Sequence, residues 1–265
     1  MGALKINKDR PIGFMDSGLG GISVLREAVK FMPSEDYIYY GDSKNAPYGV
    51  KSQEEIRRLT FHVVDELLER GIKGLAVACN TATSAAVKLL RVKYPELPIV
   101  GIEPAIKPAV VNSKGGRILV LATPMTIKQE KFRQLLAQYA AKADIVPVPC
   151  DGLMEFVERG ELEGEHLDDY FDAKIGRYLI PATESIVLGC THYPFLKKEL
   201  RSYLGNRDIQ LIDGSLGTVK ELHRRLEEKD LLKEDNKKGT VEFLNSSDDP
   251  KILERCQAFL ERKID

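Results

Sequence analysis

The sequence has no excess of charge of either sign. Its 39 Lys and Arg residues are matched by 40 Asp and Glu residues, which leaves a formal net charge of −1 at pH 7. Proteins that bind nucleic acid or an anionic membrane through electrostatic attraction carry a basic patch or excess. The balance therefore gives no indication of nucleic acid or a membrane as a partner.

Long apolar runs are also missing. No stretch approaches the roughly 20 apolar residues that a bilayer-spanning helix needs. The N-terminal sequence MGALKINKDRPIGF lacks the continuous apolar core of a signal peptide, so we expect a cytoplasmic protein. The 265 residues suffice for one large domain or two small ones.

Cysteine is scarce, and no two cysteines form a C-x-x-C pair. The four are Cys79, Cys150, Cys190 and Cys256. In a cytosolic chain they are expected to be free thiols, and the missing C-x-x-C pair argues against a zinc ribbon or a thioredoxin-type motif. Cys190 and His192 offer only two metal ligands, so we expect no metal site.

Short apolar segments alternate with helical segments along most of the chain, which is typical of a parallel α/β fold. Ser52 and Glu55 predict the start of a helix that ends at Gly71, and Asp249 with Pro250 predicts the start of the last helix. The predicted strands are Pro11–Asp16, Tyr37–Gly41, Gly74–Cys79, Pro98–Ile102, Arg117–Ala122, Asp144–Val148, Ser185–Gly189, Gln210–Ile212 and Thr240–Leu244.

Two stretches, LAVACNTATSAAV (75–87) and IVLGCTHYPFL (186–196), share one pattern. Each runs from an apolar strand through a small residue and a cysteine into polar residues and a helix-like segment. Their identity is thin, so we interpret them as analogous placements of a thiol rather than as a repeat. A helix N-terminus favours the thiolate form of a cysteine. The alternative for each cysteine is a small buried apolar side chain, which we prefer for Cys150 and Cys256.

In open parallel sheets, ligands bind beyond the carboxyl ends of the strands. Small polar residues follow several predicted strands here, and they suit a compact polar ligand whose carboxylate is held by backbone N–H groups. His192 could polarise the second thiol, since its unperturbed pKa lies near neutrality. The residues that follow predicted strands and are candidates for the site are Asp16, Ser17, Tyr48, Gly49, Cys79, Asn80, Thr81, Thr123, Thr126, Cys190, Thr191 and His192.

The segment DSGLGG, which follows the first strand, permits two interpretations. It matches neither G-x-G-x-x-G nor the P-loop pattern, so a nucleotide site is weakly indicated. The alternative is a tight glycine turn into the helix ISVLREAV. Asp16 at the end of the strand is well placed for proton transfer or for binding an ammonium group.

In this order and spacing, MDSGLGG, PYG, ACNTA and LGCTHYP resemble the glutamate racemases of the cofactor-independent aspartate/glutamate racemase superfamily. The likeness extends from about Ile12 to Gly214. It implies two similar, doubly wound α/β lobes with the active site in the cleft between them. We expect residues 1–101 with 215–265 to form the first lobe and residues 102–214 to form the second.

The resemblance also implies roles for individual residues. Cys79 and Cys190 would be the two acid/base thiols, assisted by Asp16 and His192 respectively, and Glu158 would be a further acidic residue of the site. The substrate-binding set would be Asp16, Ser17, Tyr48, Gly49, Asn80, Thr81, Thr123, Thr126, Thr191 and His192.

Two thiols suit the inversion of a stereocentre by proton transfer. One base is needed on each face of the α-carbon, one deprotonated and the other protonated. The carbanion between them needs oriented hydrogen-bond donors. If each sulfur approaches the α-carbon to about 3–3.5 Å, the sulfurs lie on the order of 7 Å apart.

We expect no cofactor, because no lysine lies at a strand end beside a phosphate cradle that pyridoxal phosphate would need. The resemblance implies a homodimer that supplies D-glutamate for peptidoglycan synthesis and cell-wall biogenesis. Two alternatives stay open. One is a racemase, isomerase or decarboxylase for another small acid or hydantoin, such as aspartate. The other is a non-catalytic protein that binds a small ligand.

Overall fold

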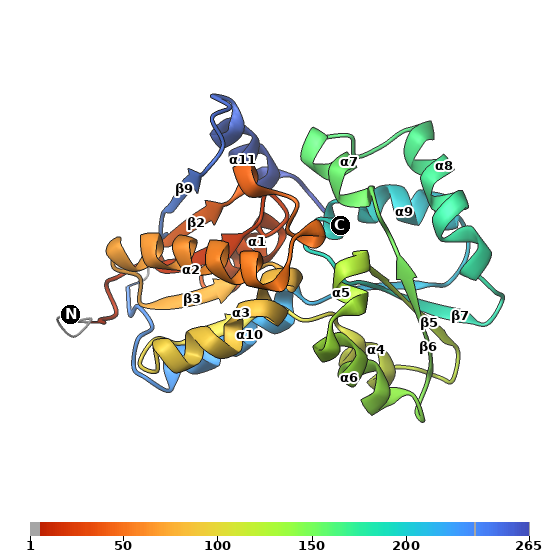
Figure 1. Cartoon of the computed structure of the whole chain (residues 1–265), viewed down its shortest axis with the longest axis horizontal. Coiled ribbons are helices and arrows are strands. Elements are labelled where there is room, and N and C mark those ends of the chain that lie inside the picture. The colour runs from red at the N-terminus through yellow and green to blue at the C-terminus, as the bar shows by residue number, and fades with distance from the viewer. Residues whose placement is uncertain (1–5, 236, 265) are drawn as a thin grey trace. The chain divides into compact units, whose positions relative to one another are not determined.

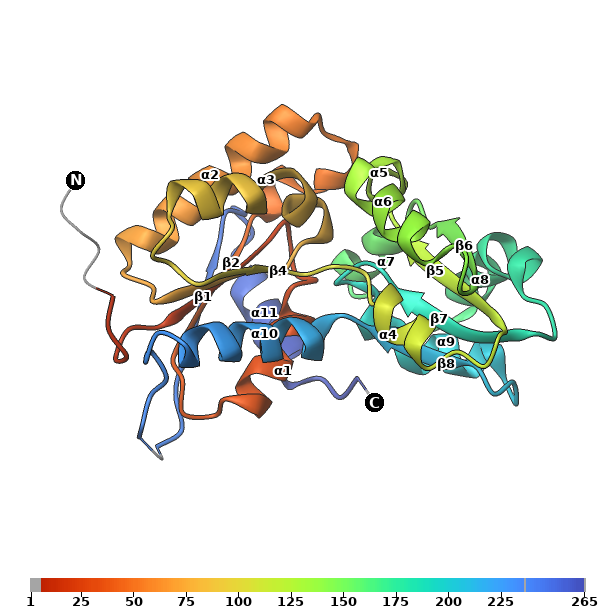
Figure 2. The same ribbon diagram turned by 90° about the horizontal axis from the view of Figure 1, so that it is seen from below.

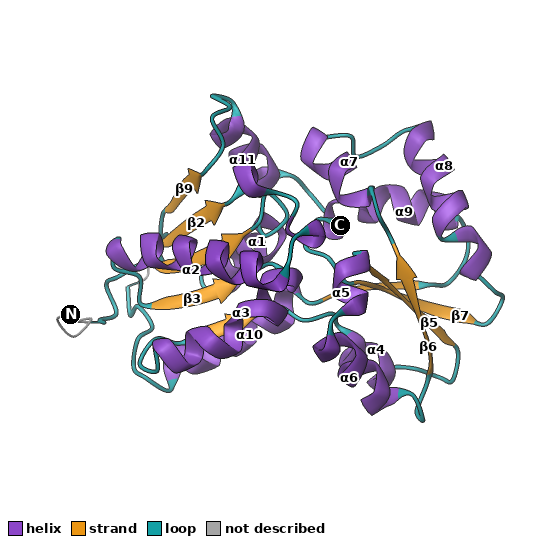
Figure 3. Cartoon of the chain, in the orientation of Figure 1, coloured by secondary structure: helices purple, strands orange, loops and turns teal. Residues whose placement is uncertain are grey.

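The computed structural model describes residues 6–235 and 237–264, which form two compact units. The chain builds most of unit 1 up to Ile102, forms unit 2 from Glu103 to Gly214, and returns to unit 1 from Ser215 to Arg262. Each unit has its own parallel β-sheet with helices on both faces (Figures 1 and 3). The predicted α/β class with two doubly wound parallel sheets is therefore confirmed.

Unit 1 contains a five-stranded sheet in the order β4-β3-β1-β2-β9, and every neighbouring pair is parallel. All residues of the central strands β1 and β3 are buried, as expected for strands covered on both faces. The strands are β1 (Ile12–Asp16), β2 (Tyr37–Gly41), β3 (Gly74–Val77), β4 (Ile99–Gly101) and β9 (Val241–Asn245).

The helices of unit 1 cover both faces of this sheet (Figure 2). Helices α2 and α3 pack together on one face, and α1, α10 and α11 cover the other. Two 3₁₀ turns, η1 (Ser43–Asn45) and η2 (Tyr48–Val50), lie between β2 and α2. The helices are α1 (Ile22–Phe31), α2 (Gln53–Glu69), α3 (Asn80–Lys93), α10 (Ser215–Glu227) and α11 (Ile252–Glu261).

Unit 2 contains a four-stranded parallel sheet in the order β6-β5-β7-β8. Its strands are β5 (Arg117–Ala122), β6 (Asp144–Pro149), β7 (Thr183–Leu188) and β8 (Gln210–Asp213). Its helices and 3₁₀ turns are α4 (Ile106–Val111), α5 (Pro124–Lys128), α6 (Glu130–Tyr139), α7 (Leu153–Arg159), α8 (Glu165–Lys174), η3 (Gly176–Tyr178), η4 (Tyr193–Leu196) and α9 (Lys197–Leu204).

The two sheets share one strand order. Read from one edge, β4-β3-β1-β2 in unit 1 corresponds to β8-β7-β5-β6 in unit 2, and β9 is an additional edge strand. The strand that precedes Cys79 and the strand that precedes Cys190 therefore hold equivalent positions in their sheets. The two cysteine-bearing stretches, which share little sequence identity, are thus alike in their position in the sheet topology.

Element ends agree with the sequence prediction to within two residues for all nine predicted strands. Ser52 caps α2 by accepting a hydrogen bond from the Glu55 backbone N–H at 3.2 Å, and Gly71 follows the helix end with φ of 78°. The last helix begins later than predicted, at Ile252. Asp249 instead accepts the Lys251 backbone N–H at 2.9 Å, in a turn that precedes the helix.

None of the helices in the described residues is long and apolar enough to cross a membrane. Within the same residues, no cluster of three or more His, Cys, Asp or Glu side chains has the arrangement of a metal site.

Candidate active site

The carboxyl ends of the central strands of unit 1 bring several predicted site residues together. Asp16 ends β1, and Cys79 comes two residues after the end of the neighbouring strand β3. Ser17 follows Asp16, and its Oγ lies 3.6 Å from the Cys79 Sγ. Because parallel strands end at one edge of the sheet, residues 62 positions apart in sequence are in contact.

Cys79 is the N-cap residue of α3. Its Sγ accepts a hydrogen bond from the Ala82 backbone N–H at 3.4 Å, and the side chain is almost fully buried. The N-terminus of this helix, with its free N–H donors and dipole, favours negative charge on the sulfur. The predicted placement of this thiol at a helix start is confirmed by the structure.

Asp16 is fully buried, and its Oδ1 accepts the Gly18 backbone N–H at 2.9 Å. The glycines after it permit close packing: a Cβ at Gly21 would lie 2.6 Å from the Asp16 Cβ. The Tyr39 hydroxyl donates to the Gly18 carbonyl oxygen at 2.7 Å. The geometry of DSGLGG is therefore that of a tight glycine turn into α1, the second of the two interpretations.

The loop after β2 carries Tyr48 and Gly49. Tyr48 is buried, and its hydroxyl donates a hydrogen bond to Asp42 Oδ2 at 2.6 Å. Burial, followed by this hydrogen bond and the negative charge of Asp42, raises the pKa of the Tyr48 phenol far above its ordinary value. Tyr48 also belongs to the apolar cluster that includes Cys79 and Ala82, and its turn η2 packs against α3, the helix that Cys79 caps.

Asn80 and Thr81 form the first turn of α3, directly after Cys79, and both are buried. The Asn80 Oδ1 accepts no hydrogen bond from any of the described residues. A buried amide oxygen of this kind is costly unless it meets a donor. It is therefore available to a polar group of a ligand.

In unit 2, Cys190 belongs to a chain of three side chains. Its Sγ lies 3.6 Å from His192 Nδ1, and His192 Nε2 lies 2.6 Å from Glu158 Oε1 on α7. Burial of His192 lowers its pKa, but the hydrogen bonds and charges of Cys190 and Glu158 outweigh burial and raise that pKa well above its ordinary value. The structure thus joins the predicted residues Cys190, His192 and Glu158.

Cys190 differs from the sequence expectation in its helix. The residues after it form the 3₁₀ turn η4 from Tyr193, and the α-helix α9 begins only at Lys197. A helix dipole acts mainly within the first turn, so it contributes little at Cys190. Pro194 lies in the short turn, where the missing N–H of proline is tolerated. The prediction of a helix N-terminus at Cys190 is therefore wrong. The group that contacts this thiol is instead the imidazole of His192.

The remaining predicted residues of unit 2 lie at the same strand ends. Thr191 is buried between Cys190 and His192. Thr123 caps α5 after β5, the neighbour of β7, by accepting the Thr126 backbone N–H at 3.2 Å. The hydroxyls of Thr123 and Thr126 lie 3.0 Å apart, so the two threonines form one polar pair.

The other two cysteines are packed in the interior, as predicted. Burial raises the pKa of the Cys150 thiol to about 12, which leaves it protonated and unreactive at neutral pH. Cys256 is fully buried on α11.

Sequence reasoning missed Asp42, which follows β2 and accepts hydrogen bonds from three side chains. The strand-end rule that selected Asp16 applies equally to Asp42, so the signal was present.

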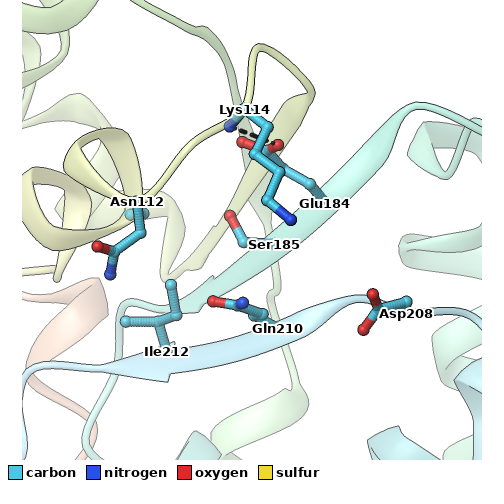
Figure 4. Close-up of a pocket in the computed structure, with 8 residues that line it drawn as sticks. Asn112, Lys114, Glu184, Ser185, Asp208, Gln210 and Ile212 are labelled. Carbon is cyan, nitrogen blue, oxygen red and sulfur yellow. Dashed lines mark hydrogen bonds between the residues drawn. The ribbon is translucent and has the colours of Figure 1, made fainter.

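A separate pocket of about 120 Å³ lies at the opposite, amino ends of β7 and β8 in unit 2 (Figure 4). Ser185, Gln210 and Lys114 line it, and Glu184 accepts the Lys114 backbone N–H at 3.0 Å. None of the predicted site residues lines this pocket. It therefore does not belong to the candidate active site.

Comparisons with known proteins identify the family of the chain. The model of the Asp/Glu/Hydantoin racemase family matches residues 12–222. A glutamate racemase from Clostridium botulinum (strain Alaska E43) is 52% identical over 96% of this chain and 98% of its own. Another, from Clostridium perfringens (strain ATCC 13124), is 50% identical over 97% of this chain and 98% of its own.

Solved structures give the same result. Glutamate racemase isoform RacE1 from Bacillus anthracis has a TM-score of 0.86 and 28% identity, with 97% of this chain and 96% of that chain covered. The Francisella tularensis glutamate racemase in complex with D-glutamate has a TM-score of 0.82 and 26% identity, with 97% and 95% covered. The predicted resemblance to the glutamate racemases is confirmed, and the predicted enzyme class, an amino-acid racemase, agrees with the names of these relatives. The chain belongs to the Asp/Glu/Hydantoin racemase family.

Proposed function

We propose that this chain interconverts L- and D-glutamate by proton transfer at the α-carbon, with Cys79 and Cys190 as the two bases. In one direction a thiolate removes the α-proton from one face, and the other thiol donates its proton to the opposite face of the resulting carbanion. In the reverse direction the roles exchange. The proton count balances without an oxidant or reductant, and the stereochemistry of the α-carbon is inverted.

The observation that carries the proposal is that each thiol has its own hydrogen-bond partners at a strand end. Cys79 is held by the Ala82 N–H and the Ser17 hydroxyl. Cys190 is hydrogen-bonded to His192, which is paired with Glu158. General acid–base groups placed in this way contribute about 10²–10⁴-fold to a rate.

The choice of glutamate is supported by the relatives, which are named for it, and by the polar lining of the site. We assign the substrate ammonium and carboxylate groups to the side chains and N–H groups around Ser17, Asn80, Thr81 and Thr191. The unpartnered Asn80 Oδ1 suits an N–H donor such as the ammonium group. Two-sided attack would require the sulfurs to lie about 7 Å apart with the α-carbon between them.

The experiment is deuterium exchange. L-Glutamate and, separately, L-aspartate are incubated with the protein in D₂O without added cofactor, and deuterium at Cα is measured by NMR together with the change in optical rotation. We expect exchange and racemisation with glutamate and much slower exchange with aspartate. Exchange with aspartate alone would redirect the proposal to another acid of the family. No exchange with either would favour a non-catalytic binding protein.

We further propose that the D-glutamate feeds peptidoglycan synthesis and that the enzyme acts in the cytoplasm as a homodimer. Depletion of the protein in its host should be rescued by external D-glutamate if this role is right. Sedimentation of the purified chain gives the subunit number directly.

A further inference from the structure

We propose that Asp42 is a positioning residue for the proposed racemisation: it anchors the loop that carries Tyr48 and Gly49 beside Cys79. The inference rests on the proposed function. Asp42 directly follows Gly41, the last residue of β2, and its backbone N–H donates to the Asp16 carbonyl oxygen at 2.9 Å. Asp42 therefore lies beside the strand end that carries Asp16.

The Asp42 carboxylate is buried and receives hydrogen bonds from three side chains. Its Oδ1 accepts from Asn45 at 2.9 Å and from the Ser246 hydroxyl at 2.7 Å. Its Oδ2 accepts from the Tyr48 hydroxyl at 2.6 Å and from Asn45 at 3.2 Å. Asp42 is 2% exposed, and a carboxylate at this depth is stable only when such donors surround it.

The three donors come from two separate parts of the chain. Asn45 belongs to η1 and Tyr48 to η2, so two of them lie in the loop itself. Ser246 directly follows the edge strand β9, and its backbone N–H donates to the Gly41 carbonyl oxygen at 3.0 Å. One carboxylate thus ties the loop to both β2 and the C-terminal strand.

This arrangement also limits what Tyr48 can do. A phenol has a single proton to donate, and in Tyr48 that proton is directed to Asp42. Since burial and Asp42 keep the phenol protonated, its hydroxyl is not a donor for a substrate carboxylate. Tyr48 therefore contributes through its ring, which packs in the apolar cluster with Cys79, and through the backbone of the loop. The position of that backbone depends on Asp42.

The experiment measures kcat and KM for glutamate in four variants: Asp42→Ala, Asp42→Asn, Tyr48→Phe and the double variant Asp42→Ala/Tyr48→Phe. We expect Asp42→Ala to lower kcat/KM by about 10- to 100-fold, mainly through KM, because a buried donor loses its acceptor. Asp42→Asn keeps an oxygen for Tyr48 and should recover most of that loss. The double variant should be no worse than Asp42→Ala alone.

A matched control is Asp248→Asn, which makes the same chemical change at an exposed carboxylate paired with Lys44. It should stay within about twofold of the parent. Thermal unfolding of every variant identifies any that fail to fold, in which case Asp42→Asn and Tyr48→Phe decide the outcome.

The inference about Asp42 and the proposed function fail on different results. If the parent racemises glutamate but the effects of Asp42→Ala and Tyr48→Phe multiply, or Asp42→Ala is fully active, Asp42 does not act through Tyr48. If the folded parent neither racemises nor exchanges glutamate, the proposed function itself fails.

Discussion

Cys79 and Cys190 follow equivalent strands in two sheets of the same strand order, yet their surroundings differ. Cys79 meets neutral groups: it accepts from the Ala82 backbone N–H at the start of α3 and is hydrogen-bonded to the Ser17 hydroxyl. Cys190 meets an imidazole that is paired with the Glu158 carboxylate. A shared topology has thus placed both thiols, while local sequence has given each different hydrogen-bond partners.

This difference has a consequence for pH dependence. Because the pKa of His192 is raised, its imidazole keeps its proton to a higher pH than an ordinary histidine does. The stability that this pairing provides is present below the unfolded-state pKa of about 6.5 and is lost as the pH rises through the folded-state pKa. The helix N-terminus at Cys79 does not titrate, so unit 1 has no matching dependence from this source.

The largest effect on activity is expected when either thiol is removed. Cys79→Ser and Cys190→Ser should each lower kcat by at least about 10³-fold, since a hydroxyl is far less acidic than a thiol and general acid–base catalysis is lost. Racemisation followed by circular dichroism is the measurement, and Cys256→Ala is the control. Full activity in either serine variant would contradict the two-base proposal.

The second-largest effect on activity is expected at Glu158, because its substitution alters the surroundings of Cys190 and leaves those of Cys79 unchanged. We expect Glu158→Gln to lower kcat/KM by about 10- to 100-fold and to shift the alkaline limb of its pH profile to lower pH. Without the carboxylate the pKa of His192 falls, so the imidazolium is lost earlier as the pH rises.

The control for this change is Glu161→Gln, which alters an exposed carboxylate paired with Arg159 on the same segment. A Glu158→Gln profile that keeps the parent's shape at all pH values would argue that Glu158 does not act through His192.

The glycine turn of unit 1 offers a test of stability. Gly21→Ala should lower the free energy of unfolding by about 1–3 kcal/mol, because its new Cβ would meet the Asp16 Cβ at 2.6 Å and the Ala78 Cβ at 3.0 Å. Gly217→Ala in α10 is the matched control, since nothing lies within 4 Å of its Cβ, and it should change stability by less than about 1 kcal/mol. Denaturant titration distinguishes them; equal effects would remove the steric explanation.

The smallest effect is expected at Ser17. Ser17→Ala should reduce kcat/KM only several-fold, because one neutral hydrogen bond to sulfur contributes about 1 kcal/mol and the Ala82 N–H remains. Measured in the same assay as Glu158→Gln, this variant shows whether the neutral hydrogen bond at Cys79 or the charged pair beside Cys190 contributes more to kcat/KM. A Ser17→Ala loss that exceeds the Glu158→Gln loss would reverse the ranking.

Much of this site could be predicted from the sequence, because strand periodicity and strand-end polarity depend on neighbours in the chain. Such local signals located the nine strands of the described residues and the start of α2. They also selected Asp16, Ser17 and Cys79, which contact one another or share a strand edge.

The rest depends on contacts that no local pattern encodes. The pairing of His192 with Glu158 joins residues 34 positions apart, and the bond from Ser246 to Asp42 spans 204. Local patterns also cannot tell an α-helix from a 3₁₀ turn after Cys190, because Pro194 and the buried Tyr193 and Phe195 suit either at that length.

The path of the chain through the two units has a consequence for synthesis. Unit 2 consists almost entirely of the continuous stretch Glu103–Gly214, whereas unit 1 still needs α10, β9 and α11 after it. Because the ribosome makes the N-terminal part first, the whole of that stretch is translated before the fifth strand of unit 1 exists. A nascent chain that ends before β9 contains both thiols but lacks Ser246, one of the three donors to Asp42. The anchor of the Tyr48 loop is therefore completed only after unit 2 has been translated.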